Sequence, residues 1–220
     1  MSRFAPEHLT PEQIEEQSAV YGPFTQAVRD LVDAAIRTEL GGDDIRAAQA
    51  AVEAVTARLR EREIEGALGV TFSEDGVGRP WGNAVIGLRN AVAPPLVVEK
   101  AEDGSRVWSQ FHLGAAYEGP PGCVHGGVAS LVLDQMLGQA AGAGGRPGMT
   151  ATLQVHYRKP TPLGPLRAEA WIERTEGHKT WARGELTGPE GLCVEAEGLF
   201  ILPRWAREPA DAETRPGFFE

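Results

Sequence analysis

An apolar segment with helical spacing, followed by four short strand-like segments, constrains the fold of this chain most. In "GCVHGGVASLVLDQMLG", from Gly122 to Gly138, large residues recur at intervals of three and four, which predicts a helix. Four segments beyond Gly148 are typical of strands, and each ends at glycine or proline: MTATLQVHYRKP, LRAEAWIERTEG, KTWARGELTG and LCVEAEGLFILP. A long helix followed by antiparallel strands indicates an α+β fold and argues against a βαβ order.

Two further segments of the second part of the chain have strand-like composition. The alternating run SRVWSQFHLG predicts a strand that precedes the apolar helix. The run AVIGLRNAVAPPLVVEK predicts one strand before and one after Pro94-Pro95. The end of the chain after Pro203 is charged and proline-rich, so we expect a loose tail. These signals divide the chain into residues 67–205, a folded domain, and residues 206–220, the tail.

The first third of the chain, residues 1–66, is predicted to be a helical extension. Thr10–Gln13 has the outline of a capping box with proline at the first helical position. A stronger helix, with an apolar face that starts at Phe24, is expected to follow and to end at Gly41-Gly42. Asp43 or Asp44 then caps a second helix, whose apolar residues follow three-four spacing: Ile45, Ala48, Val52, Val55 and Leu59. We interpret the extension as a packing or dimer-contact element.

The overall composition excludes several classes of protein. A formal net charge of −10 and a pI near 5.1 argue against a general nucleic-acid binder. The two cysteines, Cys123 and Cys193, show no C-x-x-C pairing, and the histidines have no metal-ligand spacing, so neither a disulfide framework nor a metal site is expected. No signal peptide and no membrane-spanning run is evident, and we predict a cytoplasmic protein.

The segment that enters the apolar helix carries the chemistry. His125-Gly126-Gly127 lies where a loop becomes a helix, and the first backbone N–H groups of a helix have no internal partner. The helix dipole favours negative charge at that end, and glycine lets a ligand approach the backbone. The combination predicts an oxyanion hole for acyl transfer.

A single carboxylate, Asp134, lies on the otherwise apolar helix. Such a carboxylate must be paired, hydrogen-bonded or functional, and an interface aspartate satisfied by hydrogen bonds is the alternative to a catalytic one. It follows His125-Gly126-Gly127 by seven to nine residues, roughly 10–13 Å along a helix axis. One helix cannot easily use both ends on one substrate atom, so the spacing favours a symmetric dimer in which each chain contributes one half.

The same residues resemble a known family. The run from Gly122 to Gly138, MTATLQVHYRKPTPLG, EGHK and EAEGLFI together resemble the hot-dog-fold acyl-CoA thioesterases of the phenylacetic-acid-degradation (PaaI-like) type. The similarity covers about residues 91–202 and is strongest to the branch that includes the human mitochondrial long-chain acyl-CoA thioesterases. The helical extension lies outside it.

The resemblance implies a fold, a reaction and a set of residues. The fold is an antiparallel sheet wrapped around one helix at about Gly126–Ala143, built as a homodimer and often as a homotetramer. Asp134 matches the catalytic carboxylate, as nucleophile or as general base, Gly126 the glycine that polarises the thioester carbonyl, and His125 the histidine beside it. Thr150 matches a positioning hydroxyl, although Thr152 lies on the same face of a regular strand. The implied hydrolase needs no cofactor, because coenzyme A is part of its substrate.

Two basic pairs stand out in an acidic chain. Arg158-Lys159 and His178-Lys179 flank turns of neighbouring strands and are either solvated turn charges or contacts for the phosphates of coenzyme A. We assign Gly127, Arg158, Lys159 and Lys179 to substrate binding. A non-catalytic acyl-CoA-binding or regulatory hot-dog protein is the alternative function, and a hot-dog hydratase is a second rival that the His-Gly-Gly pattern does not suggest.

Overall fold

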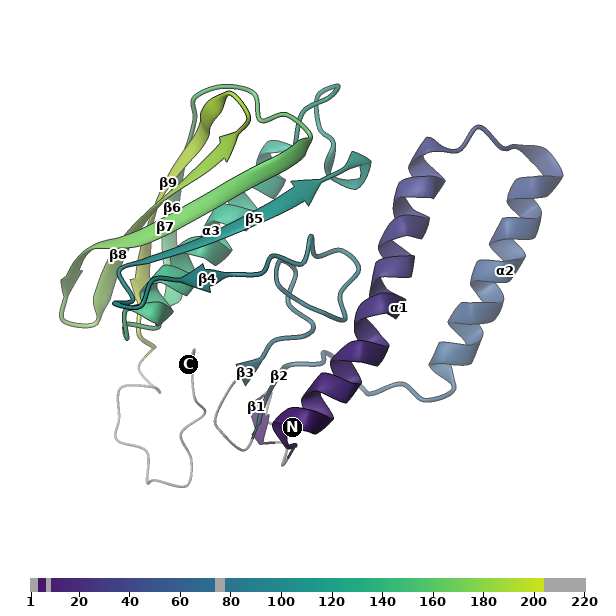
Figure 1. Cartoon of the computed structure of the whole chain (residues 1–220), viewed down its shortest axis with the longest axis horizontal. Helices are drawn as coiled ribbons and strands as arrows, with labels where there is room; N and C mark the ends of the chain where they lie inside the picture. The colour runs from purple at the N-terminus through teal and green to yellow at the C-terminus, as the bar shows by residue number, and fades with distance from the viewer. Residues whose placement is uncertain (1–3, 7–8, 74–77, 204–220) are drawn as a thin grey trace.

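A computed structural model describes residues 4–6, 9–73 and 78–203 (Figure 1). Three helices and nine strands follow one another along the described chain. In chain order, the elements are β1 (Phe4–Pro6), α1 (Pro11–Arg37), α2 (Gly42–Arg60), β2 (Val70–Phe72), β3 (Gly78–Arg79), β4 (Glu99–Lys100), β5 (Arg106–Leu113), the 3-10 turn η1 (Ala115–Tyr117), α3 (Gly126–Ala143), β6 (Met149–Tyr157), β7 (Gly164–Glu176), β8 (Lys179–Gly188) and β9 (Gly191–Ile201).

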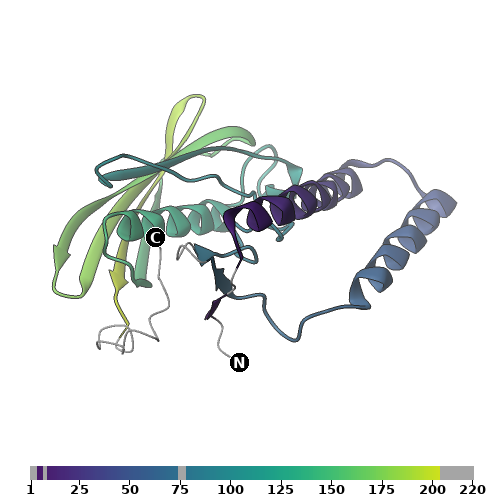
Figure 2. The same ribbon diagram turned by 60° about the horizontal axis from the view of Figure 1, so that its bottom comes forward.

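Six strands form one antiparallel sheet that lies across α3 (Figures 1 and 2). Their order is β4-β5-β7-β8-β9-β6, so β6 is one edge of the sheet although it precedes β7 in the chain. The predicted α+β arrangement, the helix at 126–143 and the five strands at and beyond residue 105 are confirmed. A small second sheet of β1, β2 and β3 brings residues 4–6 beside residues 70–72.

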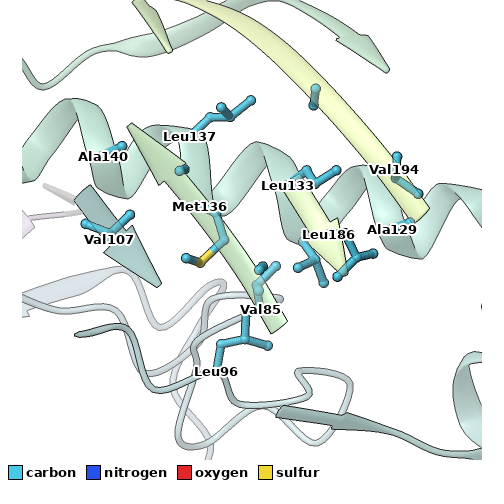
Figure 3. Close-up of a cluster of buried hydrophobic side chains, with 14 of the residues drawn as sticks. Val85, Leu96, Val107, Ala129, Leu133, Met136, Leu137, Ala140, Leu186 and Val194 are labelled. Carbon is cyan, nitrogen blue, oxygen red and sulfur yellow. The ribbon is translucent and has the colours of Figure 1, made fainter. Parts of the chain in front are cut away.

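The core lies between α3 and the sheet (Figure 3). Leu133, Met136 and Leu137 of α3 are completely buried, and the alanines at 168, 170, 182 and 196 of the sheet belong to the same buried cluster. Such small side chains let helix and sheet approach closely while the large helical residues fill the remaining volume. Packing on this side explains why α3 has no continuous polar face.

The opposite side of α3 is covered by the segment 80–98, which differs from the prediction. The strand expected before Pro94-Pro95 does not form, and the one expected after it is reduced to the two residues of β4, so residues 80–98 are a series of turns that ends at this short strand. The Asn83 side chain accepts hydrogen bonds from the backbone N–H groups of Val85 and Ile86. These bonds hold a turn instead of a strand, and they place Val85 in the core beside Leu96 (Figure 3).

The first helix joins what the sequence presented as two signals. The capping box is confirmed, since Thr10 and Gln13 exchange side-chain and backbone hydrogen bonds. The helix then continues through Pro23 to Arg37 without a second start. It is fastened to the segment 80–98 by Arg29, which donates to the carbonyl oxygens of Ala93 and Asn90, each at 2.9 Å.

The second helix starts differently from the prediction. The first helix ends at Arg37 with Thr38 as its cap, before the Gly41-Gly42 pair, and Gly41 is the N-cap of α2. Asp43 and Asp44 lie inside the first turn, where their charge still favours the helix dipole. Gly42 has a φ of 55°, a backbone conformation that glycine tolerates and that lets the chain reverse here.

Two other predictions remain predictions. The tail of residues 206–220 lies outside the described residues, and the boundary between the extension and the domain at residues 66 and 67 is an expectation from the sequence. Within the described part of the chain, no helix combines the length and apolarity needed to cross a membrane.

Candidate active site

The start of α3 presents a backbone donor. His125 is the N-cap, and its Nδ1 accepts a hydrogen bond from the Gly127 N–H at 3.0 Å. Because Nδ1 is an acceptor, the neutral ring carries its proton on Nε2, where it can donate to a ligand. The His125 carbonyl oxygen accepts from the N–H groups of Val128 and Ala129. Within residues 4–6, 9–73 and 78–203, the Gly126 N–H donates no hydrogen bond.

Two hydroxyl groups fix the first turn of this helix. The carbonyl oxygen of Gly126 lies 2.9 Å from the Tyr157 hydroxyl and 3.1 Å from Ser130 Oγ. The two hydroxyl oxygens are themselves 2.7 Å apart, so two protons serve three short contacts. A Cβ atom at position 126 would lie 3.3 Å from the Tyr157 ring, which leaves little room for any residue other than glycine. Neither hydroxyl was predicted from the sequence, although Ser130 follows Gly126 by one helical turn.

The carboxylate of Asp134 is half-buried and partnered. Its Oδ1 accepts a hydrogen bond from Thr150 Oγ1 at 2.9 Å. The alternative Thr152 does not make this contact, because a bulge between Thr150 and Thr152 breaks the alternation of β6. Next to the carboxylate, Gln135 accepts a hydrogen bond from Asn83 Nδ2 at 3.0 Å, which ties this part of α3 to the segment 80–98.

The two halves of the predicted site lie at opposite ends of β6. Thr150 starts the strand beside Asp134, and Tyr157 ends it beside Gly126, so β6 runs antiparallel to α3. Eight residues of helix separate Gly126 from Asp134, about 12 Å along the axis. A single chain therefore brings Thr150 to Asp134 but does not bring Asp134 to Gly126.

The basic residues divide between the same two ends. Arg158 and Lys159 directly follow Tyr157, where Arg158 forms an ion pair with Glu195 and Lys159 donates to the Glu190 carbonyl oxygen. The hydrogen bond from Arg158 holds the pKa of Glu195 below its usual value.

Lys179 starts β8 opposite Ile201, which in turn lies opposite Met149. Within one chain, Lys179 is therefore level with the start of β6, whereas Arg158 and Lys159 follow the end of that strand. No group of three His, Cys, Asp or Glu side chains that could hold a metal ion occurs among the described residues.

Comparisons with known proteins identify the family of this chain. The sequence profile of the Thioesterase superfamily matches residues 121–194, which include the start of α3, Asp134 and β6. A crystal structure of a thioesterase superfamily protein is 36% identical, covers 82% of this chain and 94% of its own, and superposes with a TM-score of 0.74. The chain belongs to the thioesterase superfamily. Its sheet and central helix are the hot-dog fold.

Curated relatives of this thioesterase-superfamily chain carry a more specific name. Acyl-coenzyme A thioesterase THEM4 of Xenopus laevis is 35% identical over 109 residues, which are 48% of this chain and 48% of the relative. THEM4 of Mus musculus is 33% identical over 99 residues, which are 44% of this chain and 43% of the relative. The chain spans about half the length of these curated relatives.

Proposed function

We propose that this chain hydrolyses acyl-CoA thioesters to free acid and coenzyme A, at a site that two copies share. The observation that carries the proposal is the position of the two half-sites at opposite ends of an edge strand. One end has the Asp134 carboxylate with its Thr150 hydrogen bond, and the other has the Gly126 N–H, which donates to no group among the residues that the structure describes. The relatives named acyl-coenzyme A thioesterases support the choice of thioester.

The edge strand supports the shared site. β6 has no neighbour on its outer side within the described sheet, and Met149 and Tyr157 are 62% and 55% exposed. Such an edge can pair with another strand. Antiparallel pairing of two β6 strands about their middle would lay the Thr150 end of one copy beside the Tyr157 end of the other. Asp134 of one chain would then approach Gly126 of its partner. Within one chain, these two positions lie about 12 Å apart along α3 and cannot meet.

The proposed chemistry uses the helix start and the carboxylate in separate roles. The thioester oxygen accepts a hydrogen bond from the Gly126 N–H, at the positive end of the α3 dipole, which stabilises the negative charge that develops there. The Nε2–H of His125 orients the thioester. The Gly127 N–H donates to His125 Nδ1, so in this proposal Gly127 holds the histidine in the tautomer with its proton on Nε2.

The carboxylate has two ways to complete the reaction. As a general base, Asp134 takes a proton from water while the water oxygen bonds to the carbonyl carbon, the C–S bond breaks and the proton passes to the departing thiolate. As a nucleophile, Asp134 forms an acyl anhydride with loss of the thiolate, and water then hydrolyses the anhydride. Both routes balance without a cofactor and use Thr150 to hold the carboxylate. The coenzyme A phosphates are assigned to Arg158 and Lys159. The third cation is the partner's Lys179, which starts β8 at the end of the sheet where β6 begins.

Complementation between two inactive variants tests the shared site. Asp134→Asn keeps the shape of the side chain and removes the base or nucleophile, and it should lower turnover at least ~100-fold. Gly126→Pro removes the N–H at a helix position that accepts proline, and Gly126→Ala, which adds the same Cβ near Tyr157 but keeps the N–H, is its matched control. In a mixed dimer one site has both wild-type residues, so mixing the two inactive proteins should restore thiol release.

The controls separate the reaction from the assembly. Each variant mixed with itself should stay inactive, and circular dichroism should show that both are folded. If the two variants are shown to exchange subunits but their mixture releases no free thiol, the shared site is refuted. Binding of acyl-CoA by the wild-type protein without release of free thiol would instead favour the acyl-CoA-binding alternative.

A further inference from the structure

The second helix presents an apolar stripe that nothing in the described chain covers. None of the residues of α2 is buried, and its stripe residues are 40–54% exposed: Ile45, Val52, Val55 and Leu59. Both views of the ribbon show α2 standing apart from the hot-dog body (Figures 1 and 2). An isolated helix of 19 residues is marginal in water, because most helices depend on packing of their apolar face. We therefore expect another apolar surface to pack against these residues.

The spacing of the stripe identifies the kind of occupant. Ile45, Ala48, Val52, Val55 and Leu59 recur at three, four, three and four residues. This is the spacing of a coiled-coil seam, which packs against another helix with the same spacing. A flat sheet or a membrane surface would not require so narrow a stripe, and the flanks of α2 carry charges of both signs.

We propose that α2 packs antiparallel against α2 of a second copy of this chain. Alternating apolar layers form when Ile45 faces Val55 of the second copy and Ala48 faces its Val52. The two-fold axis of this arrangement passes beside Ala51, whose small side chain permits close approach. The interface is isologous, as expected for two identical chains.

Charge complementarity selects this register and direction. Asp44 and Arg58 flank the seam on the same side, one at each end of α2. The antiparallel layers set Asp44 of one copy opposite Arg58 of the other, and the symmetry makes the pair twice. A shift by one heptad would place Ala51 opposite Arg58 and lose both pairs, and a parallel arrangement forms neither.

Within one chain, Asp44 and Arg58 cannot meet. They are 14 residues apart on a continuous helix, about 21 Å along the axis. Arg58 instead pairs with Glu61 on its own helix, but both side chains are largely exposed, so this contact does little to prevent a second one. A response that links Asp44 to Arg58 therefore reports on two chains.

A charge reversal tests the proposed pairing. Ala51→Cys, in full-length protein with Cys123→Ser, places a thiol beside the two-fold axis, and a short bismaleimide should join two chains there. Ala50→Cys is the matched control, since it lies on the opposite side of the helix and should give little covalent dimer. Asp44→Arg alone and Arg58→Asp alone each set like charges opposite each other, and each should weaken the association about tenfold, the effect of about 1.4 kcal/mol summed over two exposed pairs.

A mixture of the two reversed proteins decides the register. In a dimer of one Asp44→Arg chain with one Arg58→Asp chain, both contacts again join opposite charges. Cross-linking of the mixture should return to the level of the unreversed protein, although any loss of helix-dipole stabilisation at position 44 remains. Failure of the mixture to recover, or equal cross-linking of Ala50→Cys and Ala51→Cys, would overturn the proposal.

A change in the seam gives an independent measurement. Val52→Asp should abolish the Ala51→Cys cross-link, whereas Ala50→Asp, with the same charge on the same helix, should leave it intact. If α2 is covered instead by α1 of its own chain, Val52→Asp lowers the melting temperature and the purified protein gives no cross-link at position 51 in any variant. If another macromolecule is the occupant, the purified protein again fails to cross-link, and either result refutes self-association.

Discussion

Replacement of Thr150 by valine tests the hydrogen bond that holds the proposed catalytic carboxylate. Valine has nearly the shape of threonine and suits a strand, so the change removes little more than the hydroxyl. That hydroxyl donates to Asp134 at 2.9 Å. We therefore expect a folded protein whose carboxylate has lost one fixed donor and is no longer held in its position.

The size of the effect follows from the environment of the bond. A hydrogen bond to a charged acceptor contributes about 1.5–3 kcal/mol when it is shielded from water. Thr150 is exposed and Asp134 half-buried, so water replaces part of the loss, and about 1–2 kcal/mol remains. At 1.36 kcal/mol for each factor of ten, turnover should fall roughly 5- to 30-fold.

Release of free thiol from an acyl-CoA gives the measurement. Thr150→Ser keeps the hydroxyl and should retain most of the activity. Thr152→Val makes the same chemical change two residues away, where no hydrogen bond to Asp134 exists, and should leave turnover within about twofold of the wild type. Activity of Thr150→Val equal to the wild type, or an equal loss in Thr152→Val, would show that this hydroxyl does not support the reaction.

Three other changes give distinct readouts. Arg29→Ala removes the donor to three carbonyl oxygens of the segment 80–98, those of Gly87, Asn90 and Ala93. It should cost about 2–3 kcal/mol of folding stability, seen as a melting temperature lower by about 5–10 °C, and an unchanged melting temperature would show that α1 does not anchor this segment. For Glu169, burial raises the pKa, but hydrogen bonds from Arg106 and Arg167 outweigh it and hold the pKa below its usual value. Ionised Glu169 therefore stabilises the fold at pH values above its pKa in the unfolded chain, and this effect is lost as pH falls through its pKa in the folded protein. The difference in stability between wild type and Glu169→Gln should thus be present at neutral pH and vanish in acid. A constant difference in thermal melts across that pH range would contradict this prediction. Arg158→Ala should raise KM for acyl-CoA and leave an N-acetylcysteamine thioester unaffected, whereas an equal loss of kcat/KM for both would point to a structural role.

The central helix and the strands beyond it could be predicted because their spacing has one physical explanation. Leu133, Met136 and Leu137 recur at helical intervals. Each of the later strands is bounded by a turn that contains glycine or proline. The contact between Asp134 and Thr150 was also within reach, since the resemblance to a family with this spacing named both residues. What it could not give is the bulge that removes Thr152 from the same role.

The segment 80–98 shows where the sequence signal fails. Val85 and Leu96 of this segment are buried, whereas Val92 and Val97 are exposed. Side-chain amides hold the segment in turns, and a strand and a loop can have the same apolar composition. Asn83 was the available clue, because asparagine bonds to the backbone two residues on and stabilises a turn. The contacts of Tyr157 and Ser130 could not be predicted for a different reason. They join a helix and a strand that are adjacent only in the folded chain.

The position of β6 at the edge of the sheet has a consequence for the order in which the chain matures. Within the described sheet, β6 is joined only to β9, the last strand to be synthesised. While a ribosome is still adding residues 191–201, Asp134 and Thr150 have both emerged, but the strand that carries Thr150 has no neighbour to hold it. Every residue proposed for the reaction lies between positions 125 and 179, but Thr150 is held beside Asp134 only after the chain has grown past residue 191. A nascent chain halted before residue 191 would thus contain every one of these residues and lack the strand that fixes Thr150 against the carboxylate.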